Sequence, residues 1–182
     1  MKARIFFIIS VLTLFAWGCS KDESGSNPPP TTQEDWTFPS DATTNITVYS
    51  EKSSVAVGES FDVKVVLYNV TGIFGSAVEL TFSSANARVS SVLAGPMFAP
   101  TANILTVSNV DTVRSIASFG VTYKAGTGGS VNGSGAVFKL KCVGKAAGTA
   151  TFAINPTTLE VRKTDNTVSN PPIRPALSVT VH

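Results

Sequence analysis

The side chains with the most reactive chemistry in this 182-residue chain are two cysteines and one histidine. Cys142 ends residues 136–142, in which Lys139 and Lys141 alternate with small or apolar residues, so its thiol is expected to face a core. A buried cysteine behaves as a small apolar side chain. A nucleophilic thiol needs a nearby histidine, and the only histidine is the C-terminal His182. We therefore expect Cys142 to be structural.

Acidic residues could support acid–base catalysis or bind a metal ion, but their spacing favours neither. The twelve carboxylates are scattered, with no Asp-x-Asp motif or glutamate pair on one strand face. No catalytic triad can be assembled from the available Ser, Cys and His residues. Asp165 and Asn166 could join a calcium site, although a turn is the simpler interpretation. An enzyme is therefore disfavoured, and we expect no metal site and no cofactor.

The other cysteine, Cys19, follows a segment typical of exported proteins. Lys2 and Arg4 precede an apolar run over residues 5–17, and Gly18 stands directly before the cysteine. A basic start, a short apolar run and a small residue are the three parts of a secretory signal. The run is shorter than the roughly 20 residues that cross a membrane, which disfavours a permanent transmembrane helix.

This segment resembles a bacterial lipoprotein signal, in which the cysteine is lipidated and becomes the new N-terminus. It departs from that pattern at Ala16, where such signals usually carry leucine. The resemblance implies that residues 1–19 are the signal and that a lipid on Cys19 tethers the chain to a membrane. Ser20 replaces the aspartate that retains many lipoproteins in the inner membrane, so an outer-membrane or cell-surface location is expected. The alternative is ordinary cleavage after Gly18, which leaves a periplasmic or secreted protein.

Removal of the signal also changes the charge of the chain. The full sequence has 14 basic and 12 acidic side chains, and Lys2 and Arg4 account for the excess. The exported part is close to neutral and has no run of Lys or Arg. It therefore lacks the positive patch that attracts nucleic acid, and we expect no nucleic-acid partner.

Residues 20–44 are expected to form a flexible linker. Ser, Thr and Pro dominate the segment, and Pro28, Pro29 and Pro30 favour extended chain. Too few of its groups can be buried to form a core, so we interpret it as a tether that holds the following domain away from a lipid surface. Trp36 and Phe38 are exceptions, which either dock on the domain or mark the start of its first strand.

Residues 45–182 show the alternation of β-strands. In residues 60–69, Phe61 and every second residue after it are apolar as far as Leu67, which predicts a half-buried strand. Turn residues separate the strands, and no stretch has the apolar spacing of a helix. Eight or nine short strands predict a two-sheet β-sandwich. The expected strands are 46–49, 60–69, 75–83, 104–108, 115–124, 136–142, 149–154, 159–163 and 177–181.

Several motifs, in their order along the chain, resemble the cohesin family. Val57-Gly58-Glu59 resembles its opening V-G-D/E motif, and residues 69–73 resemble its N-V-x-G-I turn. Residues 89–95, 115–128 and 135–151 resemble later strands and a Gly-rich loop. The resemblance covers essentially all of residues 45–182. It implies an all-β, jelly-roll β-sandwich of about nine strands without a catalytic site, like the modules of cellulosomal scaffolds that bind dockerin modules.

In cohesins the partner binds one sheet face, so outward residues of two strands are the candidate partner-binding residues. They are Gly75, Ala77, Glu79 and Thr81 on one strand, and Ser118, Gly120 and Thr122 on another. Type I members commonly carry Asn and Asp where this chain has Gly75 and Ala77. The resemblance therefore implies a dockerin-like partner, but without those polar contacts. The simpler interpretation of Glu79 and Thr81 is solvated surface.

Two binding functions are left. The first is a surface-tethered, non-catalytic module that binds a dockerin-like protein, in a polysaccharide-degrading complex or another surface assembly. The alternative is a carbohydrate-binding module, since some of these share a related jelly roll and stack polysaccharide on exposed aromatic rings. The aromatic candidates are Trp36, Tyr49, Tyr68 and Tyr123, which form no obvious row, and Tyr123 has inward parity.

Overall fold

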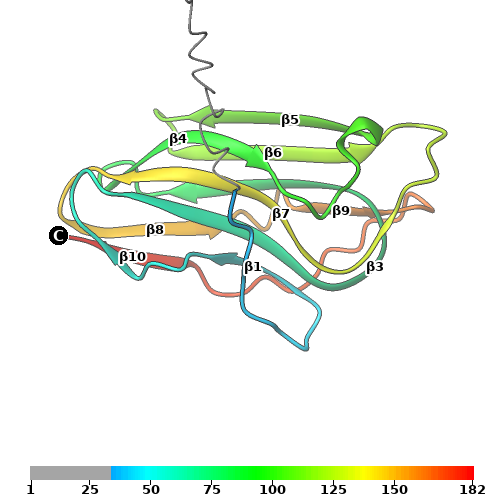
Figure 1. Ribbon diagram of the computed structural model, residues 1–182, viewed down its shortest axis with the longest axis horizontal. Helices are drawn as coiled ribbons and strands as arrows, with labels where there is room; N and C mark the ends of the chain where they lie inside the picture. Colours follow the sequence, from blue (N-terminus) through cyan, green and yellow to red (C-terminus); the bar gives the residue numbers. More distant parts are fainter. Residues whose placement is uncertain (1–33) are drawn as a thin grey trace, which may run out of the picture. The chain divides into compact units, whose positions relative to one another are not determined.

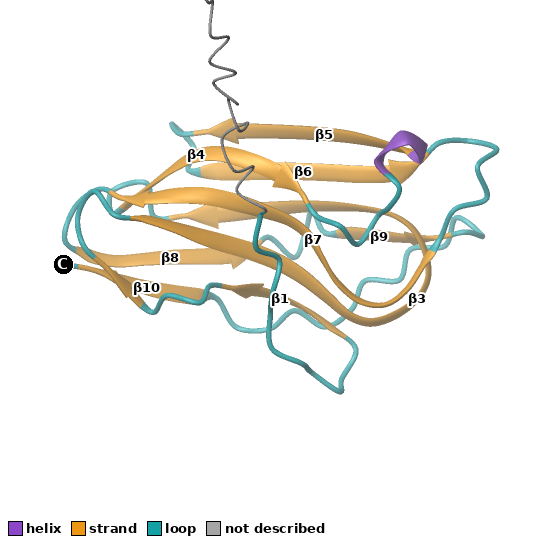
Figure 2. Ribbon diagram, viewed as in Figure 1, coloured by secondary structure: helices purple, strands orange, loops and turns teal. Residues whose placement is uncertain are grey.

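β-Strands dominate the computed structural model, which describes residues 34–182 (Figures 1 and 2). The single helix of this range is the short 3-10 turn Thr101–Asn103. Within residues 34–182 no helix has the length and apolar character needed to cross a membrane. The predicted signal with Cys19, and linker residues 20–33, lie outside the described residues.

The strands form two layers that are joined by one long strand, β3 (Ser60–Phe82). The first layer has the order β1 (Asn45–Tyr49), first half of β3, β7 (Val131–Gly144) and β4 (Ala87–Ala94). The second layer contains β5 (Ile104–Asp111), β6 (Ile116–Tyr123), the second half of β3, β9 (Glu160–Lys163), β8 (Gly148–Ile154), β10 (Leu177–Val181) and β2 (Ser54–Val55). All pairs are antiparallel except β10 with β2. The predicted all-β sandwich is confirmed, and the arrangement is consistent with a jelly roll.

Residues 69–73 bend β3 from one layer into the other (Figure 1). Asn69 and Gly72 have positive φ angles of 48° and 66°, a backbone region that asparagine and glycine tolerate best. The register with β7 shifts on both sides of Val70, and such bulges bend a strand. The motif that resembles the N-V-x-G-I turn is therefore the corner of one continuous strand, so the strands predicted at 60–69 and 75–83 are a single strand.

Alternate side chains of the two layers fill the space between them. Phe61, Val63, Val65 and Leu67 of β3 face this core, as the alternation predicted. Aromatic pairs connect the layers: the rings of Phe119 on β6 and Phe138 on β7 stack with centroids 4.8 Å apart. Burial of large apolar side chains such as these supplies most of the stabilisation of a sandwich.

The outer face of the first layer is covered by residues 35–41, which we call the strap. Trp36 and Phe38 of the strap pack on a small apolar patch formed by Val66, Tyr68 and Ala136. The ring of Phe38 meets the ring of Tyr68 edge to face at 5.7 Å. Of the two expectations for Trp36 and Phe38, docking on the domain is the one observed, and the compact unit begins at Asp35 rather than at Asn45.

The strap changes the burial of β3 from the predicted pattern. Alternation predicted a solvated face carrying Lys64, Val66 and Tyr68, yet all three are at most 2% exposed. The prediction of a half-buried strand is wrong here because the apolar stems of lysine and tyrosine can line a covered surface while their polar tips find partners. The Tyr68 hydroxyl, for example, donates a 2.6 Å hydrogen bond to the Pro39 carbonyl oxygen.

Candidate partner-binding face

Four neighbouring strands of the second layer, β5, β6, the second half of β3 and β9, form an outer surface that we call the partner face. Directly paired residues of antiparallel strands point to the same side, so the register arranges the side chains in rows. From β9 to β5, the first row is Arg162, Gly75, Thr122 and Leu105, and the second is Glu160, Ala77, Gly120 and Val107. The next rows are Glu79, Ser118 and Asn109, then Thr81, Ile116 and Asp111. All seven predicted residues therefore lie on one face, and their role in binding stays a prediction.

The centre of the partner face is a shallow groove of about 320 Å³. Gly75, Ala77 and Gly120 form its floor, so nothing larger than a methyl group rises from it. Little room exists for more at the two glycines: a Cβ on Gly75 would lie 3.0 Å from the Val121 carbonyl oxygen, and one on Gly120 would lie 3.0 Å from a methyl carbon of Val107. The small residues at these three positions thus leave a hollow.

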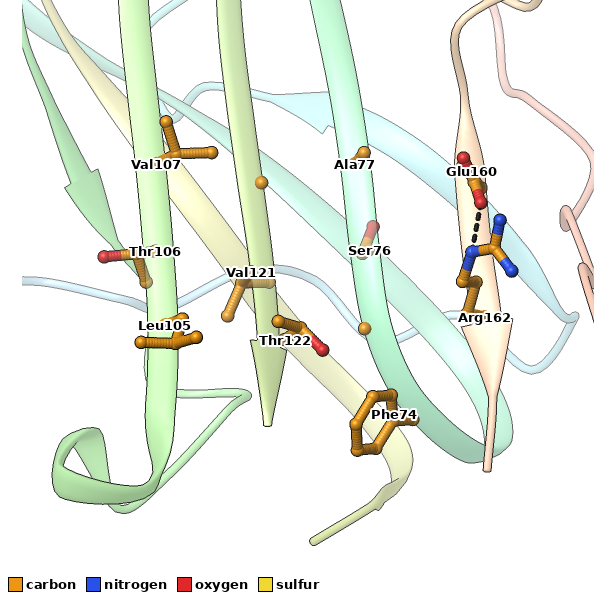
Figure 3. Close-up of a pocket in the computed structure, with 12 residues that line it drawn as sticks. Phe74, Ser76, Ala77, Leu105, Thr106, Val107, Val121, Thr122, Glu160 and Arg162 are labelled. Atoms are coloured by element: carbon orange, nitrogen blue, oxygen red, sulfur yellow. Dashed lines mark ion pairs between the residues drawn. The ribbon is translucent and has the colours of Figure 1, made fainter. Parts of the chain in front are cut away.

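The two sides of the groove differ in chemistry (Figure 3). On β5, Leu105 and Val107 stand side by side and are 57% and 71% exposed. On β9, the guanidinium Nε of Arg162 pairs with a carboxylate oxygen of Glu160. Clustered exposed aliphatic side chains with a polar rim are typical of interaction surfaces. The groove is therefore suited to an apolar group whose neighbours are polar.

A second hollow, of about 240 Å³, continues the groove along the same strands. Its lining is more polar and includes Glu79, Asn109 and Ser118. The Glu79 carboxylate accepts a 2.8 Å hydrogen bond from the side-chain amide of Asn155, which fixes its position. The partner face thus changes from apolar at Leu105 to polar at Glu79.

The sequence prediction missed half of this face. Leu105 and Val107 on β5 and Glu160 and Arg162 on β9 were not among the candidates. Apolar and polar residues alternate in residues 104–108, which was visible in the sequence. Which of the two sides faces the core becomes known only from the register of β5 with β6. No sequence signal placed β9 beside the bend of β3.

The aromatic residues proposed to stack on sugars do not form a binding platform. Tyr68 and Tyr123 are buried in the structure, at 2% and 5% exposure, and Tyr49 on β1 is half-buried. The ring of Trp36 lies under the ammonium of Lys139, whose Nζ is 4.6 Å from the ring centroid. Stacking needs exposed, coplanar rings, so the structure gives the carbohydrate-binding alternative no support.

The reactive side chains are occupied in structural roles. Burial raises the pKa of the Cys142 thiol, which keeps it in the unreactive protonated form. Hydrogen bonds from the Thr167 hydroxyl and backbone lower the pKa of Asp165, and with Asn166 at a φ of 65° they form the turn that was the simpler interpretation. Among residues 34–182 no three His, Cys, Asp or Glu side chains are grouped so that they could hold a metal ion.

Comparison with known proteins agrees with this architecture. The chain is similar to a type II cohesin domain from the cellulosome of Acetivibrio cellulolyticus, with a TM-score of 0.67 and 15% identity over 75% of this chain and 95% of that chain. It is also similar to a chain of a type I cohesin–dockerin complex from Clostridium thermocellum (TM-score 0.64, 17% identity, 76% and 99% covered). A non-cellulosomal cohesin from the archaeon Archaeoglobus fulgidus gives a TM-score of 0.59 at 16% identity, with 76% and 91% covered.

At these identities the solved structures establish the fold. A comparison with curated protein sequences finds no match. The model of the cohesin domain family, however, matches residues 44–178, which include nearly all of the sandwich. The chain belongs to the cohesin family.

Proposed function

We propose that this chain is a non-catalytic binding module that uses the partner face to bind a dockerin-like protein module. The observation that carries the proposal is the difference between the two outer faces of the sandwich. The strap covers the first layer, whereas the second layer exposes Leu105 and Val107 beside a groove. An exposed apolar groove on a stable scaffold is a common feature of protein-binding surfaces.

The dockerin class of partner is supported by the relatives. Solved structures similar to this chain include cohesin–dockerin complexes, among them the type I complex from Clostridium thermocellum. Because the floor residues are Gly75, Ala77 and Gly120, the central contact is expected to be an aliphatic side chain of the partner entering the groove. Glu79 and the Glu160–Arg162 pair would then contact polar groups around that side chain. A role in a polysaccharide-degrading assembly follows from this class of partner and is part of the proposal.

A binding assay with purified dockerin modules tests the proposal. Residues 20–182 would be immobilised and exposed to a panel of type I and type II dockerins, with insoluble polysaccharide as a parallel ligand. We expect at least one dockerin to bind. Val107→Lys is expected to weaken the affinity for that dockerin by about tenfold or more, because a charge would enter the apolar wall of the groove. Val57→Lys is the matched control, since Val57 is a 53% exposed valine in the turn beside His182.

Two results would contradict the proposal. One is an equal loss of dockerin affinity in Val107→Lys and Val57→Lys, which would place the dockerin contact outside the partner face. The other is retention on polysaccharide with no dockerin bound by any member of the panel, which would favour a carbohydrate-binding module.

We also propose that the chain is exported and held at the outer membrane or cell surface through a lipid on Cys19. The support is the signal pattern of residues 1–19 and the polar segment that follows it. Cys19→Ala is expected to move the protein from the membrane fraction to the soluble fraction. An unchanged membrane fraction would count against the lipid.

A further inference from the structure

The seat of the strap, on the outer face of β1, β3 and β7, has the properties of a peptide-binding site. Two lysines at its centre have side chains that are almost fully buried: Lys64 is 2% exposed and Lys139 is 0% exposed. Buried ammonium groups are costly unless they are paired and hydrogen-bonded, so each needs acceptors nearby. The strap supplies some of these acceptors, and the sandwich supplies the others.

The sandwich also supplies acceptors of its own to both lysines. Lys64 Nζ lies 2.8 Å from a Glu51 carboxylate oxygen, and Lys139 Nζ lies 3.0 Å from an Asp62 carboxylate oxygen. Neither Glu51 nor Asp62 belongs to the strap. Departure of the strap would therefore leave both lysines paired and able to accept the same ligand again.

The strap adds a specific set of contacts to this seat. Lys64 donates hydrogen bonds to the Asp35 carboxylate (3.0 Å) and the Thr37 carbonyl oxygen (2.7 Å). Lys139 donates to the Asp35 carbonyl oxygen (2.9 Å) and lies over the ring of Trp36. The next aromatic residue, Phe38, packs on the ring of Tyr68. The seat therefore recognises a short sequence pattern in extended chain: a carboxylate (Asp35), an aromatic ring on the next residue (Trp36) and a second aromatic ring two residues later (Phe38).

The strap is bound as a ligand is bound rather than as a strand. Residues 35–41 are not part of either sheet, and side chains of β3 and β7 hold them through carboxylate and carbonyl groups. Asp41, the last residue of the strap, accepts hydrogen bonds from Thr43 and Arg174, and these bonds organise the turn that leads to β1. The contacts of residues 35–39 with β3 and β7 do not depend on this covalent connection to β1.

We propose that this seat is a peptide-binding groove for an acidic, aromatic segment, filled here by the chain's own strap, and that the strap of a second copy can replace it. Exchange of an identical segment between copies needs no new contact. In one chain the connection gives the strap an effective concentration in the millimolar range, so exchange is expected only when the strap is weakened or copies are crowded. The seat lies on the layer opposite the partner face, so the two sites are separate.

The test uses residues 20–182, in which Trp36 is the only tryptophan because Trp17 belongs to the signal. The double variant Asp35→Asn, Trp36→Ser weakens the strap and removes all tryptophan from the protein. A synthetic peptide of residues 34–42 with a fluorescent dye at its N-terminus is added to the variant or to the unaltered chain, and the anisotropy of the dye reports binding to either protein. We expect the peptide to bind the variant at least about tenfold more tightly than the unaltered chain, in which the strap competes.

Further substitutions show where the peptide binds. Adding Lys139→Met to the double variant is expected to weaken binding by about tenfold or more, because a carbonyl acceptor and the tryptophan ring lose their cation. Adding Lys145→Met, at an exposed lysine that contacts the Ser84 carbonyl, is the matched control and is expected to have no effect. Circular dichroism of each variant verifies that the sandwich is folded.

Absence of peptide binding to the folded double variant, or equal binding with and without Lys139→Met, would overturn the proposal. The result does not depend on the partner face. Strap binding and dockerin binding can therefore fail independently.

Discussion

At the scale of single residues, glycines have two distinct uses in this sandwich. Gly95, after β4, lies so close to β7 that a Cβ would stand 2.1 Å from the Ala136 carbonyl oxygen. Gly120 faces the groove, where a Cβ would meet only a methyl carbon of Val107 at 3.0 Å. Backbone cannot move aside as a flexible side chain can. The first glycine is therefore required by packing, and the second shapes the partner face.

This difference predicts unequal effects of the same substitution. Gly95→Ala is expected to lower the free energy of unfolding by at least about 1–3 kcal/mol, because β4 and β7 must separate to admit the methyl group. Gly120→Ala is expected to change it by less than about 1 kcal/mol, because alanine in a strand also costs less backbone entropy than glycine. Urea unfolding of both variants measures the two values. Equal losses would contradict the close approach at Gly95.

At the scale of elements, most strands were predictable, whereas the strap was foreseen only as one of two alternatives for Trp36 and Phe38. Alternation located the strands because an inward side chain is followed by an outward one, as in Phe61 to Leu67. It could not reveal that residues 35–41 cover Lys64 and Tyr68, because this contact joins segments that are distant in sequence. Asn69 and Gly72 marked the corner of β3 in the sequence. Asparagine and glycine are common both in a turn between two strands and in a bend within one strand, so the sequence could not tell these two structures apart.

Protonation is expected to loosen the strap in acid. The Thr37 backbone N–H and the Lys64 ammonium hold the pKa of Asp35 well below its ordinary value of 3.8. The backbone and hydroxyl of Thr43 do the same for Asp41. Because both pKa values are lower in the docked state than in the free state, the ionised carboxylates stabilise docking above about pH 4, and this contribution is lost as the pH falls further.

The fluorescence of Trp36 in residues 20–182 measures this effect. We expect constant emission from about pH 8 to pH 5, followed by a change below about pH 4. The β-sheet signal in circular dichroism should persist at the pH where the tryptophan emission changes, because the sandwich core does not contain the two carboxylates. Emission that stays constant until the whole sandwich unfolds would show that the carboxylates do not hold the strap.

At the scale of the whole molecule, the two outer faces differ in how they are covered. The strap binds to the first layer, and the partner face of the second layer exposes its aliphatic side chains. The sequence predicted the seven residues on β3 and β6 that share this face, because strand parity determines which side chains point outward. It could not supply Leu105, Val107 and the Glu160–Arg162 pair, because their positions depend on how β5 and β9 pair with those strands.

The central claim is that this face, and no other, contacts a dockerin-like partner. Amide hydrogen exchange of residues 20–182, measured with and without a bound dockerin module, tests it most directly. We predict that added protection is concentrated in β5, β6, the second half of β3 and β9, with Leu105 and Val107 inside the protected region. Protection confined to β1, β4 and β7 would contradict the assignment of the partner face.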